Sequence, residues 1–333
     1  MHAAAVNLRG GVSPRGTLLR GQSIIEYVLI AAVISLVVVF AGPQVSGAIR
    51  NQFNQVTNKV DSGTEGDNFI SAEEKAYREA MKTVSSKEAK DWTLDEQKAA
   101  ATDIAKNGTS SVVYAKAKAA MDAGTTWSVK LTDGKTMTYR IIGINHDDLA
   151  DGSDKAGLTF LTTSTNISSR MNATQTNAGG WKQSELRQKM NSGEIWNLMP
   201  SEFQSKVKSV RKLTNNVGGG SANKNAAVTD TSDKLFLLSY SEIVPASYWA
   251  SSHPWTSFEG TQYEAFKGKV TNNNSGNSAI ANGNTWWERS VYPGDSASFL
   301  TVFGSGPATE YYGCPSDNHY AKPSYRVCPA WCF

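Results

Sequence analysis

The hydrophobic positions near the start of the chain form one long block. Residues 24–41 make a run of 18 positions, of which only three are polar. As an α-helix the run is about 27 Å long, close to the thickness of the hydrocarbon core of a bilayer. The pattern therefore predicts a membrane-spanning helix, and the arginines that precede it favour a cytoplasmic location for the N-terminus.

Helical spacing of apolar residues continues weakly after this block and then gives way to shorter helices. The polar, glycine-containing stretch 61–67 breaks the first helix. Capping boxes at Ser71 and Thr93 then open two helices rich in Ala, Lys and Glu. The pattern predicts an assembly helix over 22–60 and a helical stalk or connector over 61–124.

The last part of the chain has a different composition. From residue 125 onward β-branched and aromatic residues replace Ala and Lys, and eight of the nine Trp occur there. Apolar and alternating runs predict strands, and two other runs predict short helices that Ser184 or Ser201 could cap. The predicted strands cover 127–131, 137–144, 158–163 and 234–239, and the helices cover 183–190 and 202–207. The pattern indicates one α+β domain with long loops over 125–333.

The charge of the chain does not indicate nucleic-acid binding. The chain holds 33 Lys and Arg against 30 Asp and Glu, and Arg9, Arg15 and Arg20 account for the whole excess. Without this N-terminal stretch no basic surplus remains, so we expect no nucleic-acid partner.

Glu26 decides between three interpretations of the apolar run. A cleaved secretory signal has a shorter apolar core than residues 24–41. A plain membrane anchor fits the length but has no use for a carboxylate, which costs about 2.5–3.5 kcal/mol in the middle of a bilayer. A charge in this position is expected where a partner supplies the opposite charge.

The residues around Glu26 resemble the cleavage motif of Flp-type (type IVb, Tad-system) pilins. Gly21 precedes the cleaved bond, Gln22 follows it, and Glu26 and Tyr27 occupy the positions of the family's Glu-Tyr pair. The resemblance implies that residues 1–21 are a leader removed by a prepilin peptidase. It also implies that Glu26 pairs with the new N-terminal amine of a neighbouring subunit. An ordinary signal anchor with an unrelated Glu-Tyr pair is the alternative.

The C-terminal part resembles an uncharacterised family of bacterial surface domains. The resemblance implies a C-type-lectin-like fold, as in adhesins and in the variable proteins of diversity-generating retroelements, whose last strands and loops carry a binding face. Arg326 and Cys328 depart from the family's pattern. The matching pieces are residues 142–147, 179–181, 235–243, 259–263, 286–290 and the chain end.

The stretch 294–325 has the composition of a binding surface. Tyr supplies contact area at a low cost in entropy, and Asp and Asn supply adaptable hydrogen bonds. A retroelement that changes template adenines can turn Asn codons into codons for most residues of this stretch, but not for Glu310 or Lys322. A polar surface loop whose Tyr cover the core is the alternative. The predicted ligand-binding residues are Asp295, Ser298, Tyr311, Tyr312, Asp317, Asn318, His319 and Tyr320.

All three cysteines, Cys314, Cys328 and Cys332, lie in the last twenty residues. If the chain end is a strand, Cys328 and Cys332 are about 13 Å apart and cannot bond to each other. Cys332 matches the Cys of the resembled family, whereas the other two are additions. We therefore expect a Cys314–Cys328 disulfide, with three free thiols as the alternative.

The sequence predicts neither an enzyme nor a cofactor. Its four His are scattered, and no Ser-His-Asp or Gly-x-Ser-x-Gly signature occurs. The acidic stretch 147–154 offers oxygen ligands of the kind that calcium takes, but its spacing is not that of an EF-hand. A solvated turn is the favoured interpretation of this stretch.

Together these features predict a minor or tip subunit of an Flp/Tad-type pilus. We expect it in the cell membrane before assembly and on the cell surface afterwards. Its expected partners are other pilin subunits, a prepilin peptidase and an unknown protein or glycan ligand. The alternatives are a membrane-anchored surface binding protein outside any pilus, and a structural major pilin.

Overall fold

The computed structural model divides the chain into two compact units, Met1–Phe69 and Ile70–Phe333. It describes residues 72–164, 166–216, 228–247, 253–271, 277–280, 282–304 and 313–333, all within the second unit. The predicted leader, membrane helix and assembly helix lie outside the described residues, as does Ser71. Among the described residues, no helix has the length and apolar character needed to cross a membrane.

The second unit begins with three helices, α3 (Ala72–Ser86), α4 (Leu94–Asn107) and α5 (Tyr114–Ala123). A short 3-10 helix, η1 (Ala89–Asp91), lies between α3 and α4, and a second, η2 (Gly108–Ser110), follows α4. The predicted capping box of α4 is confirmed. The Thr93 hydroxyl accepts a hydrogen bond from Glu96 N at 3.3 Å, and the Glu96 carboxylate accepts one from Thr93 N at 2.8 Å.

A four-stranded antiparallel sheet follows, in the order β1-β2-β3-β11. Its strands are β1 (Thr126–Lys130), β2 (Thr136–Ile144), β3 (Leu158–Ser164) and β11 (Ala330–Cys332). The first three confirm the predicted strands to within one residue at each end. Buried and exposed positions alternate in β1, whereas the first five residues of β3 are all buried, so apolar and β-branched composition carried the prediction of β3.

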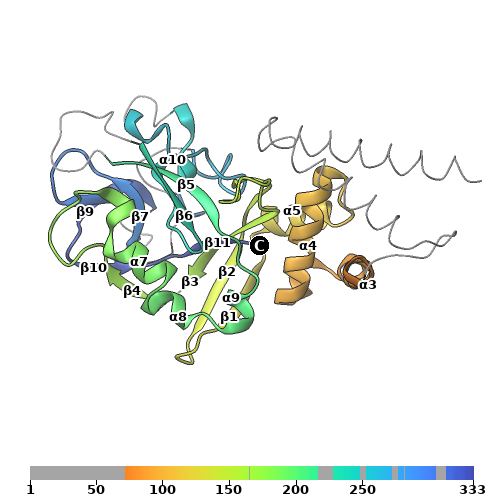
Figure 1. Cartoon of the computed structure of the whole chain (residues 1–333). Helices are drawn as coiled ribbons and strands as arrows, with labels where there is room; N and C mark the ends of the chain where they lie inside the picture. Colours follow the sequence, from red (N-terminus) through yellow and green to blue (C-terminus); the bar gives the residue numbers. More distant parts are fainter. Residues whose placement is uncertain are drawn as a thin grey trace, which may run out of the picture. The chain divides into compact units, whose positions relative to one another are not determined.

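A five-stranded sheet has the order β4-β10-β7-β8-β9. Its strands are β4 (Ser168–Arg170), β10 (Ser324–Arg326), β7 (Trp286–Val291), β8 (Ser298–Phe303) and β9 (Cys314–Tyr320). The hairpin of β5 (Val210–Asn215) and β6 (Val228–Asp233) forms a third sheet. Figure 1 shows this mixed arrangement of helices and strands, so the predicted α+β class is confirmed.

Short helices connect the sheets. They are α6 (Gly180–Gln183), α7 (Glu185–Asn191), α8 (Glu194–Leu198), α9 (Ser201–Gln204), α10 (Tyr240–Ile243) and η3 (Pro254–Thr256). Ser184 caps α7, as one of the two predicted caps, because its hydroxyl accepts a hydrogen bond from Arg187 N at 3.1 Å. Ser201 lies inside α9, and the N-cap position belongs to Pro200.

The predicted strand over 234–239 is wrong. Only Phe236 forms a bridge, to Ala330 of β11, and Leu238 O accepts a hydrogen bond from Arg289 N of β7 at 2.9 Å. The segment therefore connects one sheet to the other, and Leu235 to Leu238 are completely buried. Its apolar run reflects burial from all sides, which periodicity does not distinguish from a central strand.

The N-terminal helices pack on the first sheet within the same unit (Figure 1). Trp127 Nε1 donates a hydrogen bond to Ala89 O at 3.1 Å, and Tyr139 OH donates one to Gln97 Oε1 at 3.1 Å. Gly157 approaches α4 so closely that an added Cβ would lie 1.8 Å from the Ala101 oxygen. The helices predicted as a connector thus contribute to the core of the β-rich part.

Candidate functional site

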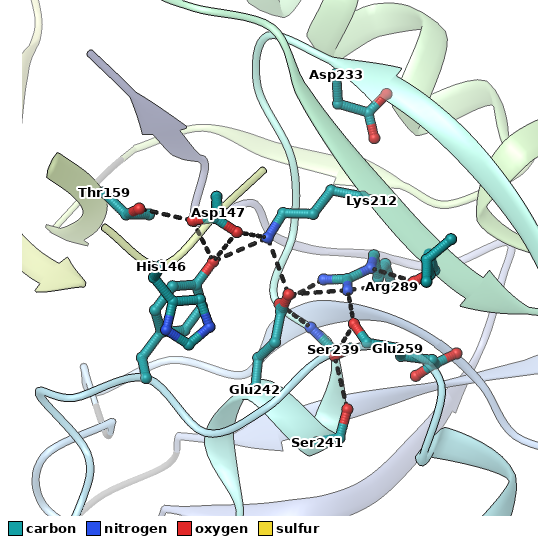
Figure 2. A network of polar contacts seen from close by, with 12 residues as sticks. His146, Asp147, Thr159, Lys212, Asp233, Ser239, Ser241, Glu242, Glu259 and Arg289 are labelled. Atoms are coloured by element: carbon teal, nitrogen blue, oxygen red, sulfur yellow. Dashed lines mark hydrogen bonds and ion pairs between the residues drawn. The ribbon is translucent and has the colours of Figure 1, made fainter. Parts of the chain in front are cut away.

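Four charged side chains from distant parts of the chain meet inside the second unit. Asp147 follows β2, Lys212 lies on β5, Glu242 on α10 and Arg289 on β7, and all four are buried. Figure 2 shows Glu242 between the two cations, with Asp147 on the far side of Lys212. We call these four residues the charge network.

Lys212 uses its ammonium group to join three side chains. Its Nζ donates to Asp147 Oδ1, to Glu242 Oε1 at 2.9 Å and to Tyr263 OH at 2.9 Å. The Tyr263 hydroxyl donates in turn to the Asp147 carboxylate at 2.9 Å, and Thr159 Oγ1 donates to the same carboxylate at 2.6 Å. Every proton of the buried ammonium therefore has an acceptor, as a buried charge requires.

Arg289 binds Glu242 through two nitrogens. Nη1 lies 2.5 Å from Glu242 Oε2, and Nη2 lies 3.0 Å from Glu242 Oε1. The guanidinium also donates to backbone oxygens, including Leu237 O at 2.9 Å. Glu242 is the last residue of a capping box, because its carboxylate also accepts a hydrogen bond from Ser239 N at 3.0 Å. The start of α10 thus fixes where this carboxylate lies.

The ion pairs determine the protonation of the charge network. Burial by itself would raise the pKa of Asp147, but the charges of Lys212 and His146 outweigh it and hold that pKa well below its usual range. Burial likewise opposes ionisation of Glu242, yet Arg289 and Lys212 lower its pKa. The two carboxylates in turn raise the pKa of Lys212 against the effect of burial. All four side chains are therefore charged at neutral pH.

Two further carboxyls lie beside the charge network. Glu259 accepts hydrogen bonds from Asn215 N at 3.0 Å and from Ser290 Oγ at 2.5 Å. Burial raises its pKa to about 7, in spite of the nearby Arg289. Burial also raises the pKa of Glu288 well above its usual value.

A pocket of about 240 Å³ is lined in part by the charge network. Three network residues, Asp147, Lys212 and Glu242, line it together with Phe258, which is 54% exposed. Lys155, which forms a 3.0 Å ion pair with Asp148, also lines it. Because the three network residues already bind one another, they shape the pocket and do not offer a free charge to a ligand.

The predicted ligand-binding residues that the structure describes gather around β8 and β9. Ser298 pairs with Tyr320 across the two strands, and Asp295 holds the turn before β8. The Asp295 carboxylate accepts hydrogen bonds from Ala297 N, Ser298 N and Ser298 Oγ, each at 2.7 Å. Asn318 is half-buried, and Tyr320 is 53% exposed. Tyr311 and Tyr312 lie outside the described residues.

Asp317 and His319 lie side by side on β9. The His319 Nδ1 atom is 3.2 Å from Asp317 Oδ2 and 3.0 Å from Thr301 Oγ1 of β8. A catalytic relay from a carboxylate to a hydroxyl uses both ring nitrogens of the His, whereas here one nitrogen contacts both groups. These contacts tie the two strands together.

The predicted Cys314–Cys328 disulfide is wrong for this structure. Cys328 is a buried free thiol whose sulfur accepts a hydrogen bond from Asn282 Nδ2 at 3.1 Å. Cys314 begins β9, and β7 and β8 separate that strand from β10, which precedes Cys328. Two intervening strands place the sulfurs too far apart for a bond. Cys332 is buried, as expected.

The acidic stretch 147–154 divides into two parts. Asp147 points inward and belongs to the charge network, so the interpretation of the whole stretch as a solvated turn is wrong at this residue. Asp151 accepts hydrogen bonds from Ser153 N at 3.0 Å and Ser153 Oγ at 2.7 Å, as in a surface turn. In the described part of the chain, no group of three or more acidic, His or Cys side chains is arranged to hold a metal ion.

Sequence reasoning missed the charge network, although a signal for it was present. Charged residues follow closely on apolar stretches, since Glu242 comes soon after residues 235–238 and Arg289 soon after two Trp. A charge within an otherwise apolar segment indicates a buried partner. The sequence did not show that these charges meet, because the members of an ion pair are up to 65 positions apart, as are Asp147 and Lys212.

Comparison with known proteins shows two separate matches. Residues 156–332, more than half of the chain, match the family described as a domain of unknown function (DUF6273). Residues 20–60 match the Flp/Fap pilin component. No curated protein and no solved structure matches the chain.

The pilin match has direct consequences for the role of the chain. It indicates a pilus-related subunit that assembles with other pilin subunits at the cell surface. The C-terminal match gives the family of the larger part but no activity. The chain therefore belongs to the DUF6273 family and carries a pilin-like segment at its N-terminal end.

Proposed function

We propose that the chain is a minor or tip subunit of an Flp/Tad-type pilus that displays a ligand-binding domain. The observation that carries this proposal is the order of the two matches. A pilin segment at residues 20–60 precedes a compact unit, Ile70–Phe333, that holds the whole DUF6273 region. A domain of this size on every subunit would interfere with helix packing in a thin filament, which favours a minor or tip position.

The proposed route to the surface begins in the membrane. A prepilin peptidase cuts between Gly21 and Gln22, and the helix over 22–60 holds the subunit in the bilayer until assembly. Glu26 then pairs with the new N-terminal amine of a neighbouring subunit, with Tyr27 beside it. This pairing removes an uncompensated carboxylate from the lipid, which accounts for a charge in the apolar run.

The proposed ligand is a protein or a glycan. The half-exposed end of β9, with Asn318, His319 and Tyr320, supports recognition there because it combines an aromatic ring with hydrogen-bonding groups. A C-type-lectin-like arrangement of this region, and its variation by a retroelement, belong to the same proposal. A near-repeat of the terminal codons that differs only at adenines would support the retroelement.

The first test is processing at Gly21. The full chain is produced in cells that contain a prepilin peptidase, and the mass and N-terminal sequence of the membrane-associated protein are measured. We expect the wild type to begin at Gln22 and Gly21→Ala to keep residues 1–21, because the peptidase requires the small residue before the cut. Gly16→Ala, a matched change in the same leader, should be processed like the wild type.

A chain that begins at Met1, or one cut after Ala41, contradicts the pilin proposal. Glu26 would then have no partner, and an anchored or secreted binding protein would be the better explanation. If processing occurs at Gly21, the number of copies per purified filament separates a minor or tip subunit from a major pilin.

A further inference from the structure

The buried ionisable groups in and around the charge network include more carboxyl groups than cations. Lys212 and Arg289 are neutralised by Asp147 and Glu242, with which they form ion pairs. Glu259 and Glu288 are also buried, at 1% and 0% exposure, and neither forms an ion pair with a basic side chain in the part of the chain that the structure describes. Two carboxyl groups therefore remain without a counter-charge of their own.

Glu288 is the more isolated of the two. Both of its carboxyl oxygens are buried and have no hydrogen-bond partner among the described residues. The charged groups that face it are the carboxyls of Glu259, Asp317 and Glu242 and the guanidinium of Arg289. Three of these four disfavour a negative charge on Glu288, and the one cation is already held by Glu242.

Glu259 is better connected but is not paired. Its oxygens receive hydrogen bonds from Asn215 N and Ser290 Oγ, and Arg289 contacts only its backbone oxygen. The charged groups that face it are Arg289, which favours ionisation, and Glu242 and Glu288, which oppose it. An ionised carboxylate in a dry interior needs a direct counter-charge, and a neutral carboxylic acid does not.

We propose that Glu259 and Glu288 are held as neutral carboxylic acids in the folded unit and make its stability depend on pH. Protonation of the two carboxyls stabilises the folded unit in mildly acidic surroundings, and this stabilisation is lost as the pH rises through neutrality. This property belongs to the fold of Ile70–Phe333 and does not depend on pilus assembly or on any ligand.

The sign follows from proton binding. Both carboxyls have a higher pKa in the folded state than the ordinary value of 4.5. Their stabilising effect is complete below about pH 4.5 and is lost as the pH rises through the folded value, which is about 7 for Glu259 and well above the ordinary value for Glu288. Asp147 and Glu242 have lowered pKa values and act in the opposite direction, below their ordinary range.

The test measures unfolding of the full chain in detergent micelles between about pH 5 and about pH 8. This range ends where the half-buried amine of Lys98, with a pKa of about 8, begins to contribute. Tryptophan fluorescence reports on this unit alone, because all nine Trp lie beyond residue 70. We expect the unfolding constant of the wild type to increase by up to about tenfold per pH unit for each of the two carboxyls.

Glu288→Gln and the double variant with Glu259→Gln keep the size of the side chain but cannot ionise. We expect each variant to remove part of this pH dependence, so that it unfolds less readily than the wild type at about pH 8 and similarly at about pH 5. Glu194→Gln is the matched control, since its side chain is 70% exposed, and it should keep the wild-type dependence.

A wild-type stability that is flat or rises over this range overturns the proposal. So does a double variant with the same pH dependence as the wild type. If the variants do not fold, the infrared spectrum of the native wild type at about pH 7 still decides the question. A protonated-carboxyl band that disappears on unfolding supports the proposal, and the absence of such a band in the folded protein overturns it.

Discussion

Among single residues, Lys212 joins three buried side chains from distant parts of the second unit. Its ammonium group contacts Asp147 after β2, Glu242 on α10, and Tyr263 in the segment between η3 and β7. No other ammonium group of the charge network contacts these three side chains. Removal of one ion from a buried pair leaves the other unpaired, which costs more than the pair itself contributes.

We therefore expect Lys212→Met to lower the free energy of unfolding by about 3–5 kcal/mol. The methionine fills a similar volume but leaves the buried charge of Asp147 without its ion-pair partner. Arg211→Met, on the neighbouring position of β5, is the control. Its ion pair with Asp230 is more than half exposed on both sides, so we expect a loss below about 1 kcal/mol.

Urea denaturation followed by tryptophan fluorescence measures both variants. Equal losses for Lys212→Met and Arg211→Met would show that the charge network contributes no more than a surface ion pair.

Among the helices and strands, α4 shows how a local signal fixes the start of an element. Thr93 and Glu96 exchange hydrogen bonds at its N-terminus, and this capping box is recognisable from the sequence. The helix then buries Ala100, Ala101 and Ile104. Its small residues allow a close approach to Gly157, just before β3, where an added side chain would collide with the backbone of Ala101.

Thr93→Ala removes the hydroxyl that accepts the Glu96 N–H hydrogen bond, and we expect it to cost about 1 kcal/mol of stability. Thr102→Ala, in the exposed middle of the same helix, is the control. Its hydroxyl bonds only to Lys98 O, one turn back, so we expect a change within about 0.5 kcal/mol or a slight gain. Thermal unfolding of the two variants, measured side by side, gives the comparison, and similar values would contradict the role of the cap.

At the scale of the whole molecule, the helices α3 to α5 and the sheets belong to one compact unit. Trp127 and Tyr139 complete hydrogen bonds to Ala89 and Gln97 across this boundary. Lys206 of the later chain lies 2.8 Å from Asp95 of α4. A domain that began at residue 125 would expose this face of the first sheet to water.

We expect a fragment of residues 70–333 to fold cooperatively and a fragment of residues 125–333 to lack fixed tertiary structure. The reason is that the shorter fragment loses the apolar cover that α4 and α5 provide. Near-ultraviolet circular dichroism and denaturation of the two fragments make the comparison. A shorter fragment with the same signal and transition would show that residue 125 is a true domain boundary.

The sequence by itself determined the features that rest on neighbouring residues. The pilin segment is recognised from Gly21 and Glu26 together with the apolar run, and residues 20–60 match the pilin component. The capped start of α4 and the strands over 126–164 follow from hydrogen bonds, alternation and local composition within a few positions.

Only the tertiary structure decided which distant residues meet. The order of the five-stranded sheet placed two strands between Cys314 and Cys328, and the packing of both sheets turned the apolar segment after Lys234 into a link between them. The charge network arises in the same way, because folding brings Asp147, Lys212 and Arg289 from distant parts of the chain to their partners and excludes water around them. Burial makes a charge depend on its partner, and the fold, through long-range packing, decides what is buried.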